Sequence, residues 1–155
     1  MTTPVTLVYF TVNGVFVDVE SADPAGSSST LSYENISGFV TFYPRLPKGA
    51  VQFIANLTLP VSGSASAALA IAPVDGRIMS GQLCTINSAD TVGVQLLASS
   101  SLFDINPLIY DVKFTQVTYA AASQQISNFG FTAPYTATTV SITDPTLARI
   151  PYGGP

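Results

Sequence analysis

The amino-acid sequence predicts an all-β protein, an antiparallel β-sandwich of the jelly-roll-like or immunoglobulin-like type. Apolar and polar residues alternate with a period of two along many short segments, and helical periodicity is almost absent. The 11 glycines and 11 prolines are spread along the chain and separate these segments. Many short strands joined by turn residues are typical of sandwiches, although a closed barrel produces the same alternation. We therefore expect the 155 residues to form one domain and leave the strand order open.

The first expected element is a β-hairpin in VYFTVNGVFVDV, residues 8–19. The pair Asn13-Gly14 is the strongest short hairpin signal, because both residues tolerate a positive φ. A turn there makes Val12 face Val15 and puts six apolar side chains on one buried face: Val8, Phe10, Val12, Val15, Val17 and Val19. With the Ser-rich loop that follows, the hairpin makes up an amino-terminal part over residues 1–36.

Residues 37–143 are expected to form the sandwich core, with strands near 38–43, 51–59, 67–72, 92–98, 126–132 and 138–143 and a loop of small residues over 63–66. The clearest strand is NPLIYDVKFTQVTY, residues 106–119, in which apolar side chains point one way and Asp111, Lys113 and Thr115 the other. The pattern inverts after Thr115, which predicts a bulge near Thr115-Gln116 or passage to the partner sheet. Gly93 is expected to mark a bulge or a close approach.

The segment DGRIMSGQL, residues 75–83, has residues that could form a chemical site, but the sequence favours a structural interpretation. Asp75-Gly76 is expected to turn, Gly81 to bend before the next strand, and Arg77 to be available for an acid at an interface. The chain has no histidine and one cysteine, which excludes Ser–His and Cys–His pairs and a thiolate zinc site. Cys84 is interpreted as a buried, inert thiol. We expect no enzymatic activity, no cofactor and no metal.

The charge of the chain points to protein partners. Charged residues make up 9% of the sequence, against about 25% in an ordinary soluble domain. Five basic residues and a net charge of -4 exclude a basic face for nucleic acid. No run reaches the roughly 18 apolar residues that a membrane span needs, and the first residues lack a secretory signal. We therefore expect synthesis in the cytoplasm, and apolar surface that is buried against other protein chains.

The last residues, 144–155, are expected to form an extended tail. We expect it to lie along a neighbouring subunit or to add a strand to it. The alternative is a tail that folds back on its own domain or is disordered. The expected partner-binding residues are Leu147, Arg149, Ile150, Pro151 and Tyr152.

Several segments recur, in this order, in a set of virion proteins: VTFYPRLPKG, APVDGRIMSGQLCTIN, GVQLLA, LIYDVKFTQVTY, FGFTAP and TDPTLARIPY. Because these segments occur together, the chain resembles the minor tail proteins of actinobacterial tailed phages over about residues 37–152. The second half is also similar to β-sandwich modules of phage baseplate and tail-tip proteins. The resemblance implies a structural protein of the tail tip or fibres, located in the virion, with other virion proteins and copies of itself as partners. It implies no catalytic residues.

Two alternatives stay open beside this expectation. A capsid decoration protein would share the composition and the β-rich fold. A glycan-binding module that contacts the host surface would need stacking surfaces, for which four tyrosines are candidates: Tyr33, Tyr43, Tyr119 and Tyr135.

Overall fold

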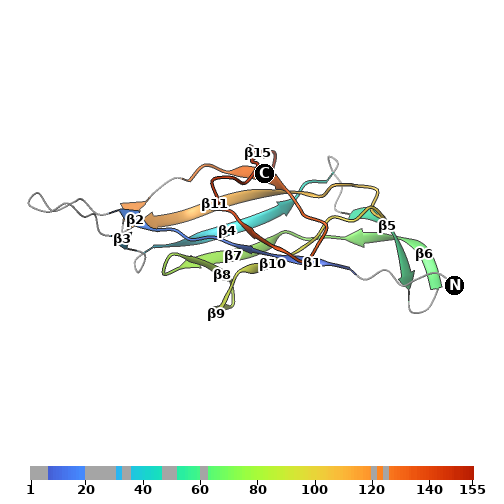
Figure 1. Cartoon of the computed structure of the whole chain (residues 1–155), viewed down its shortest axis with the longest axis horizontal. Helices are drawn as coiled ribbons and strands as arrows, with labels where there is room; N and C mark the ends of the chain where they lie inside the picture. The colour runs from blue at the N-terminus through green and yellow to red at the C-terminus, as the bar shows by residue number, and fades with distance from the viewer. Residues whose placement is uncertain are drawn as a thin grey trace, which may run out of the picture.

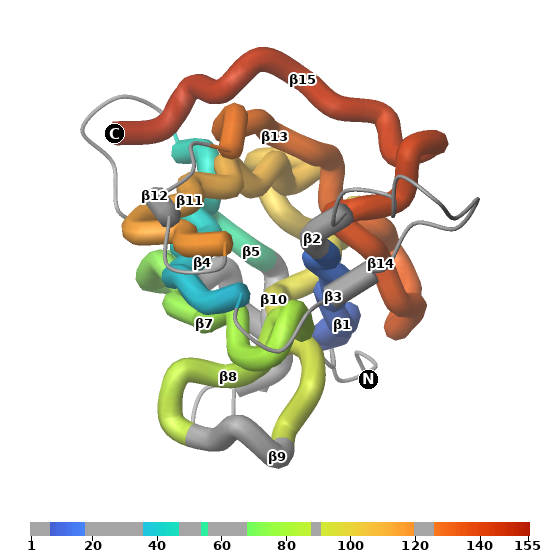
Figure 2. The backbone as a smooth tube through the Cα atoms, turned by 90° about the vertical axis from the view of Figure 1, so that its left-hand side faces the viewer, coloured from blue at the N-terminus to red at the C-terminus, as the bar shows by residue number. Residues whose placement is uncertain are grey.

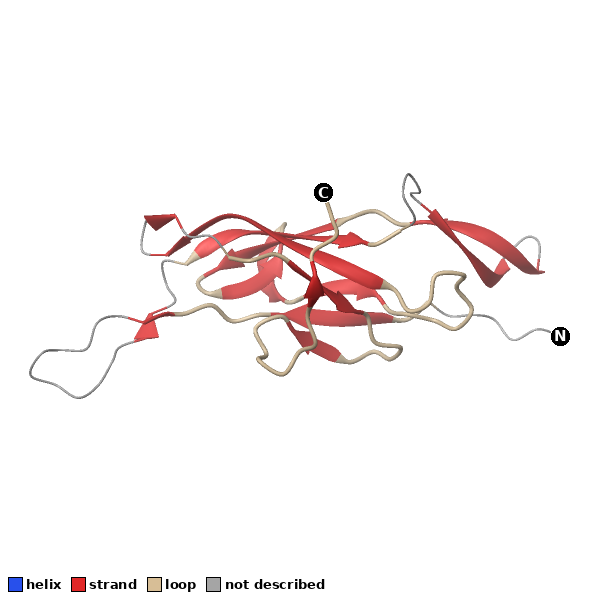
Figure 3. Cartoon of the chain, turned by 90° about the horizontal axis from the view of Figure 1, so that it is seen from above, coloured by secondary structure: helices blue, strands red, loops and turns tan. Residues whose placement is uncertain are grey.

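The computed structural model describes residues 7–19, 31–32, 36–46, 52–59, 63–119, 122–123 and 126–155. These residues form an all-β sandwich without a helix, as Figures 1 and 3 show. The predicted fold class is therefore confirmed. Within the same ranges there is no helix long and apolar enough to cross a membrane.

The larger layer is an eight-stranded sheet in which every pairing is antiparallel. It is open, so the chain does not close into a barrel. Its strands run in the order β15 (Ile150–Pro151), β13 (Phe129–Thr132), β11 (Ile109–Tyr119), β4 (Ser37–Pro44), β7 (Val74–Met79), β8 (Gln82–Thr85) and β9 (Ser88–Val92), and β12 (Ala122–Ser123) also pairs with β11.

The smaller layer has three strands in the order β10 (Val94–Leu97), β1 (Tyr9–Asn13) and β14 (Thr139–Ser141). Strand β1 is antiparallel to β10 and parallel to β14, so this layer is mixed where we expected only antiparallel pairs. Two further strand pairs, β2 (Asp18–Val19) with β3 (Leu31–Ser32) and β5 (Gln52–Leu59) with β6 (Gly63–Ala70), lie at opposite ends of the long axis (Figure 1). The loop of small residues that we expected over 63–66 is thus the start of β6.

One hydrophobic core joins the two layers. Phe10 of β1 makes edge contacts with Tyr110 of β11 and Phe131 of β13, at ring-centroid distances of 6.0 and 6.1 Å. The hydroxyl of Tyr110 donates to the carbonyl of Leu97 at 2.8 Å, which satisfies a buried polar group. Burial raises the pKa of this phenol well above its ordinary value, so it stays a neutral donor.

The predicted hairpin at Asn13-Gly14 is wrong. Strand β1 lies between β10 and β14, and beyond Asn13 the chain passes across to β8 in the other sheet. There Phe16 N–H donates to Gly81 O at 2.7 Å, and Leu83 N–H donates to Gly14 O at 3.1 Å. Of the six side chains expected on the buried face, Phe10 and Val12 are buried, whereas Val8, Val15 and Val17 are exposed. The burial of Val19 lies outside what the structure describes. Phe16, expected on the other face, is buried. Pairing with distant strands outcompetes the local turn.

The predicted irregularities in the strands are confirmed. The pairing of β11 with β4 shifts between Thr115 and Thr118, and Gln116 has a φ of 53°. The bulge returns Val117 to the buried side, where it is 2% exposed. Gly93 has a φ of 91°, and a Cβ there would lie 2.8 Å from Cγ2 of Thr11. It bends the chain between β9 and β10 and leaves Val92 exposed, not on the face shared by Val94 and Leu96.

The segment DGRIMSGQL forms strand β7, a turn and the start of β8, and its turn lies elsewhere than expected. Asp75-Gly76 is inside β7, where a Cβ on Gly76 would meet Cγ2 of Val94 at 2.9 Å and the carbonyl of Cys84 at 3.0 Å. The turn is at Ser80-Gly81, with φ values of 49° and 75°, as a tight two-residue hairpin requires. The predicted bend at Gly81 is thus confirmed, and the predicted turn at Asp75-Gly76 is wrong.

Candidate functional site

The carboxy-terminal tail, residues 144–155, lies on its own domain. Strand β15 adds to the edge strand β13, with Ile150 opposite Gly130 and Pro151 opposite Phe129. Figure 2 shows the tail running past β13 along the outside of the sheet. Of the arrangements open from the sequence, a tail folded back on its own sheet is therefore the one that the single chain adopts.

The structure brings the five expected partner-binding residues together along this tail. Leu147 packs against the core, and Ile150 and Tyr152 are half-buried. Arg149 and Pro151 are exposed. The guanidinium of Arg149 lies 4.9 Å from the centre of the Phe129 ring and donates to the carbonyls of Ile142 and Leu147. Their contact with a neighbouring subunit stays a prediction.

An ion pair between Arg45 and Asp111 holds the tail. Arg45, directly after β4, donates through Nη2 to Asp111 Oδ1 at 2.6 Å and through Nε to Oδ2 at 3.1 Å. The same Nη2 donates to the carbonyl of Pro151 at 3.0 Å. Asp111 Oδ1 also accepts from the backbone N–H of Gly153 at 2.9 Å. Two side chains of the domain therefore bind two backbone groups of the tail.

The carboxylate of Asp111 is 1% exposed, which makes this pair energetically important. A buried carboxylate is tolerated only with a good ionic partner and further hydrogen bonds, both of which are present here. The hydrogen bond to Asp111 raises the pKa of Arg45 further above its ordinary value, so the guanidinium keeps its charge.

Glycines let the tail approach this pair. A Cβ on Gly153 would lie 3.1 Å from Nη2 of Arg45, and one on Gly154 would lie 2.8 Å from the hydroxyl of Tyr152. Lys113 adds a further hydrogen bond, since its Nζ donates to the Pro155 oxygen at 3.2 Å. We use the term tail site for the surface that receives the tail: Arg45, Asp111, Lys113, Phe129 and Gly130.

The tail site is not apparent from the sequence. The sequence pattern places the side chain of Asp111 on the outward, polar side of its strand. In the structure Asp111 lies opposite Tyr43 of β4. Asp111 is buried because the tail covers it. The alternation of polar and apolar residues along one strand does not indicate that another segment will cover the strand. The two glycines that follow Tyr152 are the available signal, since glycine permits close approach of one backbone to another group.

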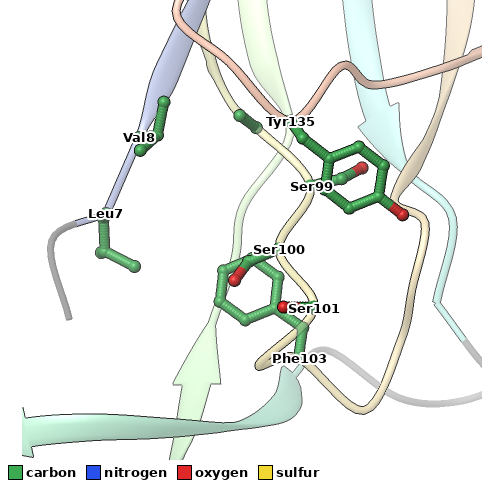
Figure 4. Close-up of a pocket in the computed structure, with 8 residues that line it drawn as sticks. Leu7, Val8, Ser99, Ser100, Ser101, Phe103 and Tyr135 are labelled. Atoms are coloured by element: carbon green, nitrogen blue, oxygen red, sulfur yellow. The ribbon is translucent and has the colours of Figure 1, made fainter.

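A second candidate is a pocket of about 200 Å³ near the start of β1, shown in Figure 4. Its apolar lining consists of Leu7, Val8, Ala98 and Phe103, and its polar lining of Ser99, Ser100, Ser101 and Tyr135. Tyr135 is 50% exposed, and its hydroxyl donates to Oδ1 of Asn106. The ring is thereby held in place beside the serines.

Two serines of this pocket hold the loop through hydrogen bonds. Ser99 Oγ donates to the carbonyl of Ala133 at 2.8 Å and accepts from the N–H of Leu108 at 2.9 Å. Ser100 Oγ accepts from the N–H of Leu102 at 3.2 Å. The pocket thus offers hydroxyl groups and an aromatic ring beside apolar side chains.

The structure does not gather the tyrosines into one glycan platform. Tyr43 lies at the end of β4 near the tail, where its partner is Asp111, whereas Tyr119 lies eight residues further along β11. Eight residues of a strand span about 27 Å. Tyr135 lies at the pocket of Figure 4, and Tyr33 is outside the described residues.

The outer face of the large sheet carries a third feature. Phe39 of β4 is 41% exposed and lies directly opposite Arg77 of β7. Residues paired in this way point to the same face of a sheet. Nε of Arg77 is buried and has no hydrogen-bond partner among the described residues. We call Phe39 and Arg77 the outer patch.

Other ionisable groups offer little chemistry. Cys84 is buried, and burial raises the pKa of its thiol, which disfavours the reactive thiolate. Its sulfhydryl donates to the carbonyl of Gln82 at 3.5 Å. Across the ranges that the structure describes, no three acidic or cysteine side chains lie close enough to hold a metal ion.

Comparisons with protein-family models, with curated proteins and with solved structures find no match to this chain.

Proposed function

We propose that this chain is a structural subunit that works in a protein assembly, and that the assembly is the tail of a bacteriophage. The outer patch supports the first part. Phe39 is exposed and lies beside Arg77, and aromatic residues and arginine are both enriched in protein interfaces. A partner that covers Phe39 would bury an exposed aromatic ring beside this cation.

The surface as a whole supports the same proposal. Charged residues make up 9% of the chain, and ten large apolar side chains of the described residues are more than one-third exposed. Exposed apolar residues are common on monomers, but here few charges separate them. Permanent interfaces are apolar in this way, because they resemble a domain core cut in half.

The proposed assignment to a phage tail rests on the resemblance of segments such as VTFYPRLPKG and LIYDVKFTQVTY to minor tail proteins. A β-sandwich with one buried cysteine suits a subunit that is made in a reducing cytoplasm and then works outside the cell. The proposed partners are other virion proteins and further copies of this chain, without a cofactor and without a catalytic role.

Immunogold electron microscopy of purified phage particles tests the proposal. We expect gold at the distal end of the tail. Gold over the head would make the chain a capsid decoration protein, and a copy number in the hundreds would agree with a capsid lattice. Mass spectrometry of the same particles detects the chain even if its epitopes are buried in the assembly and the antibody cannot bind. A chain present in the lysate but absent from particles by both methods contradicts the virion proposal.

The pocket of Figure 4 favours a second candidate function, binding of a host-surface glycan. The fixed ring of Tyr135 could stack on the apolar face of a sugar, with serine hydroxyls beside it. On a glycan array, the full chain should then give a signal that Tyr135→Ala abolishes and that Tyr135→Phe, which keeps the ring, retains in part. An array without signal for the unaltered chain would exclude this candidate.

A further inference from the structure

The tail is held by its side chains, such as Leu147 against the core, and also through its backbone. The tail site binds the carbonyl of Pro151, the N–H of Gly153 and the oxygen of Pro155. The strand ladder between β15 and β13 adds only two residue pairs. The side chains of the tail site, and above all the buried ion pair, therefore provide much of the attachment. The same hydrogen bonds can form whether the tail belongs to this chain or to another copy of it.

The connection that precedes β15 has the features of a hinge. Residues 143–146, between β14 and the segment that meets the tail site, are exposed. Thr143 Oγ1 accepts from the distant N–H of Val15, but the hydrogen bonds of the residues after it are local. Asp144 Oδ1 accepts from both the N–H and the hydroxyl of Thr146, and the carbonyl of Asp144 accepts from the N–H of Leu147. The eight residues from 142 to 149 could span about 26 Å when extended. That is far enough to reach a neighbouring molecule.

We propose that the tail site also receives the tail of a second copy of this chain, so that copies become linked by tail exchange. Each hydrogen bond that breaks when a tail leaves one molecule forms again on the other, which makes such an exchange inexpensive in free energy. A tail on its own domain has an effective concentration of the order of millimolar, so single molecules in dilute solution keep their tails. Neighbours in an assembly reach comparable local concentrations, and exchange becomes competitive there.

The Arg45–Asp111 pair sets the rate of this exchange. Releasing the tail removes the hydrogen bonds of Pro151 and Gly153 from two charged side chains at once. Hydrogen bonds to charged groups are stronger than those between neutral groups. Tail exchange is a property of the chain itself and does not depend on which particle contains it. Its test is therefore independent of the test of the phage assignment.

Disulfide trapping with full-length chains tests the exchange. Phe129 and Pro151 are directly opposite each other, at a separation that suits a disulfide. A tagged Phe129→Cys chain is mixed with an untagged Pro151→Cys chain at about 1 mM, the order of the effective concentration, and then oxidised. We expect a covalent heterodimer on a non-reducing gel, at several times the yield of a control pair in which Thr136→Cys replaces Pro151→Cys.

Two further variants make the result decisive. The double variant Phe129→Cys/Pro151→Cys should form its internal link, which shows that both positions can react. If it does so while the mixed pair gives no more heterodimer than the control pair, tail exchange is overturned. Adding Asp111→Asn to both members of the mixed pair should speed heterodimer formation by about tenfold, because it removes the buried charge but keeps the shape. An unchanged rate would overturn the role of the ion pair.

Discussion

Replacing Arg45 with alanine is expected to lower the free energy of unfolding by about 3 kcal/mol, which urea denaturation of the full chain would measure. The substitution leaves the carboxylate of Asp111, which is 1% exposed, without its ionic partner. Removing one member of a buried pair costs about 3–5 kcal/mol in other proteins. We expect the lower end, because the side chain of Arg45 is itself 34% exposed.

The matched control is Arg149→Ala. Arg149 is a cation of the tail itself and also contacts the edge strand, but it is exposed and its partners are the ring of Phe129 and two carbonyl groups, without a carboxylate. Its loss should cost about 0.5–1 kcal/mol. Asp111→Ala should cost less than Arg45→Ala, since the remaining cation can turn to solvent whereas the remaining anion cannot. Equal losses for Arg45→Ala and Arg149→Ala would contradict this account of the ion pair.

Replacing Phe42 with alanine is expected to lower the free energy of unfolding by about 3–5 kcal/mol. Phe42 is 0% exposed, in the second half of β4, and its loss leaves a cavity between the two layers. The close packing of a core allows only partial collapse around such a cavity. Thermal or urea unfolding measures the change.

Phe39 on the same strand provides the control. It is the same residue type three positions earlier, but it is 41% exposed on the outer face. Phe39→Ala should change the free energy of unfolding by about 0.5 kcal/mol or less. A large loss from Phe39→Ala would mean that it contributes to the core and that the outer patch is not a free surface of the folded chain.

Features that depend on one strand and its immediate neighbours could be predicted from the sequence. The inversion of the pattern after Thr115 predicted the bulge, because side chains must alternate along any strand. Gly93 predicted a close approach, because only glycine adopts its φ without strain. Both predictions needed no knowledge of which strand lies beside which.

Features that depend on distant partners could not be predicted. Asn13-Gly14 has strong turn chemistry, but β1 gains more by pairing with β10 and β14 on both sides. The burial of Asp111 depends on a tail whose contact residue Gly153 is 42 positions away, and on Arg45, 66 positions away. In each case the structure depends on contacts between residues that are far apart in the sequence. These contacts outweigh the local preference that the sequence pattern shows.

The position of β1 has a consequence for synthesis of the chain on the ribosome. Its neighbours are Gln95 on one side and Thr139 on the other, opposite Thr11. The three-stranded layer therefore cannot close until almost the whole described chain has emerged. Until then, Phe10 and Val12, which end up fully buried, lie on a strand with an unpaired edge and are more accessible to other molecules. Folding of the sandwich is thus expected to be slow, because strands β1 and β14, which pair with each other, are far apart in the sequence.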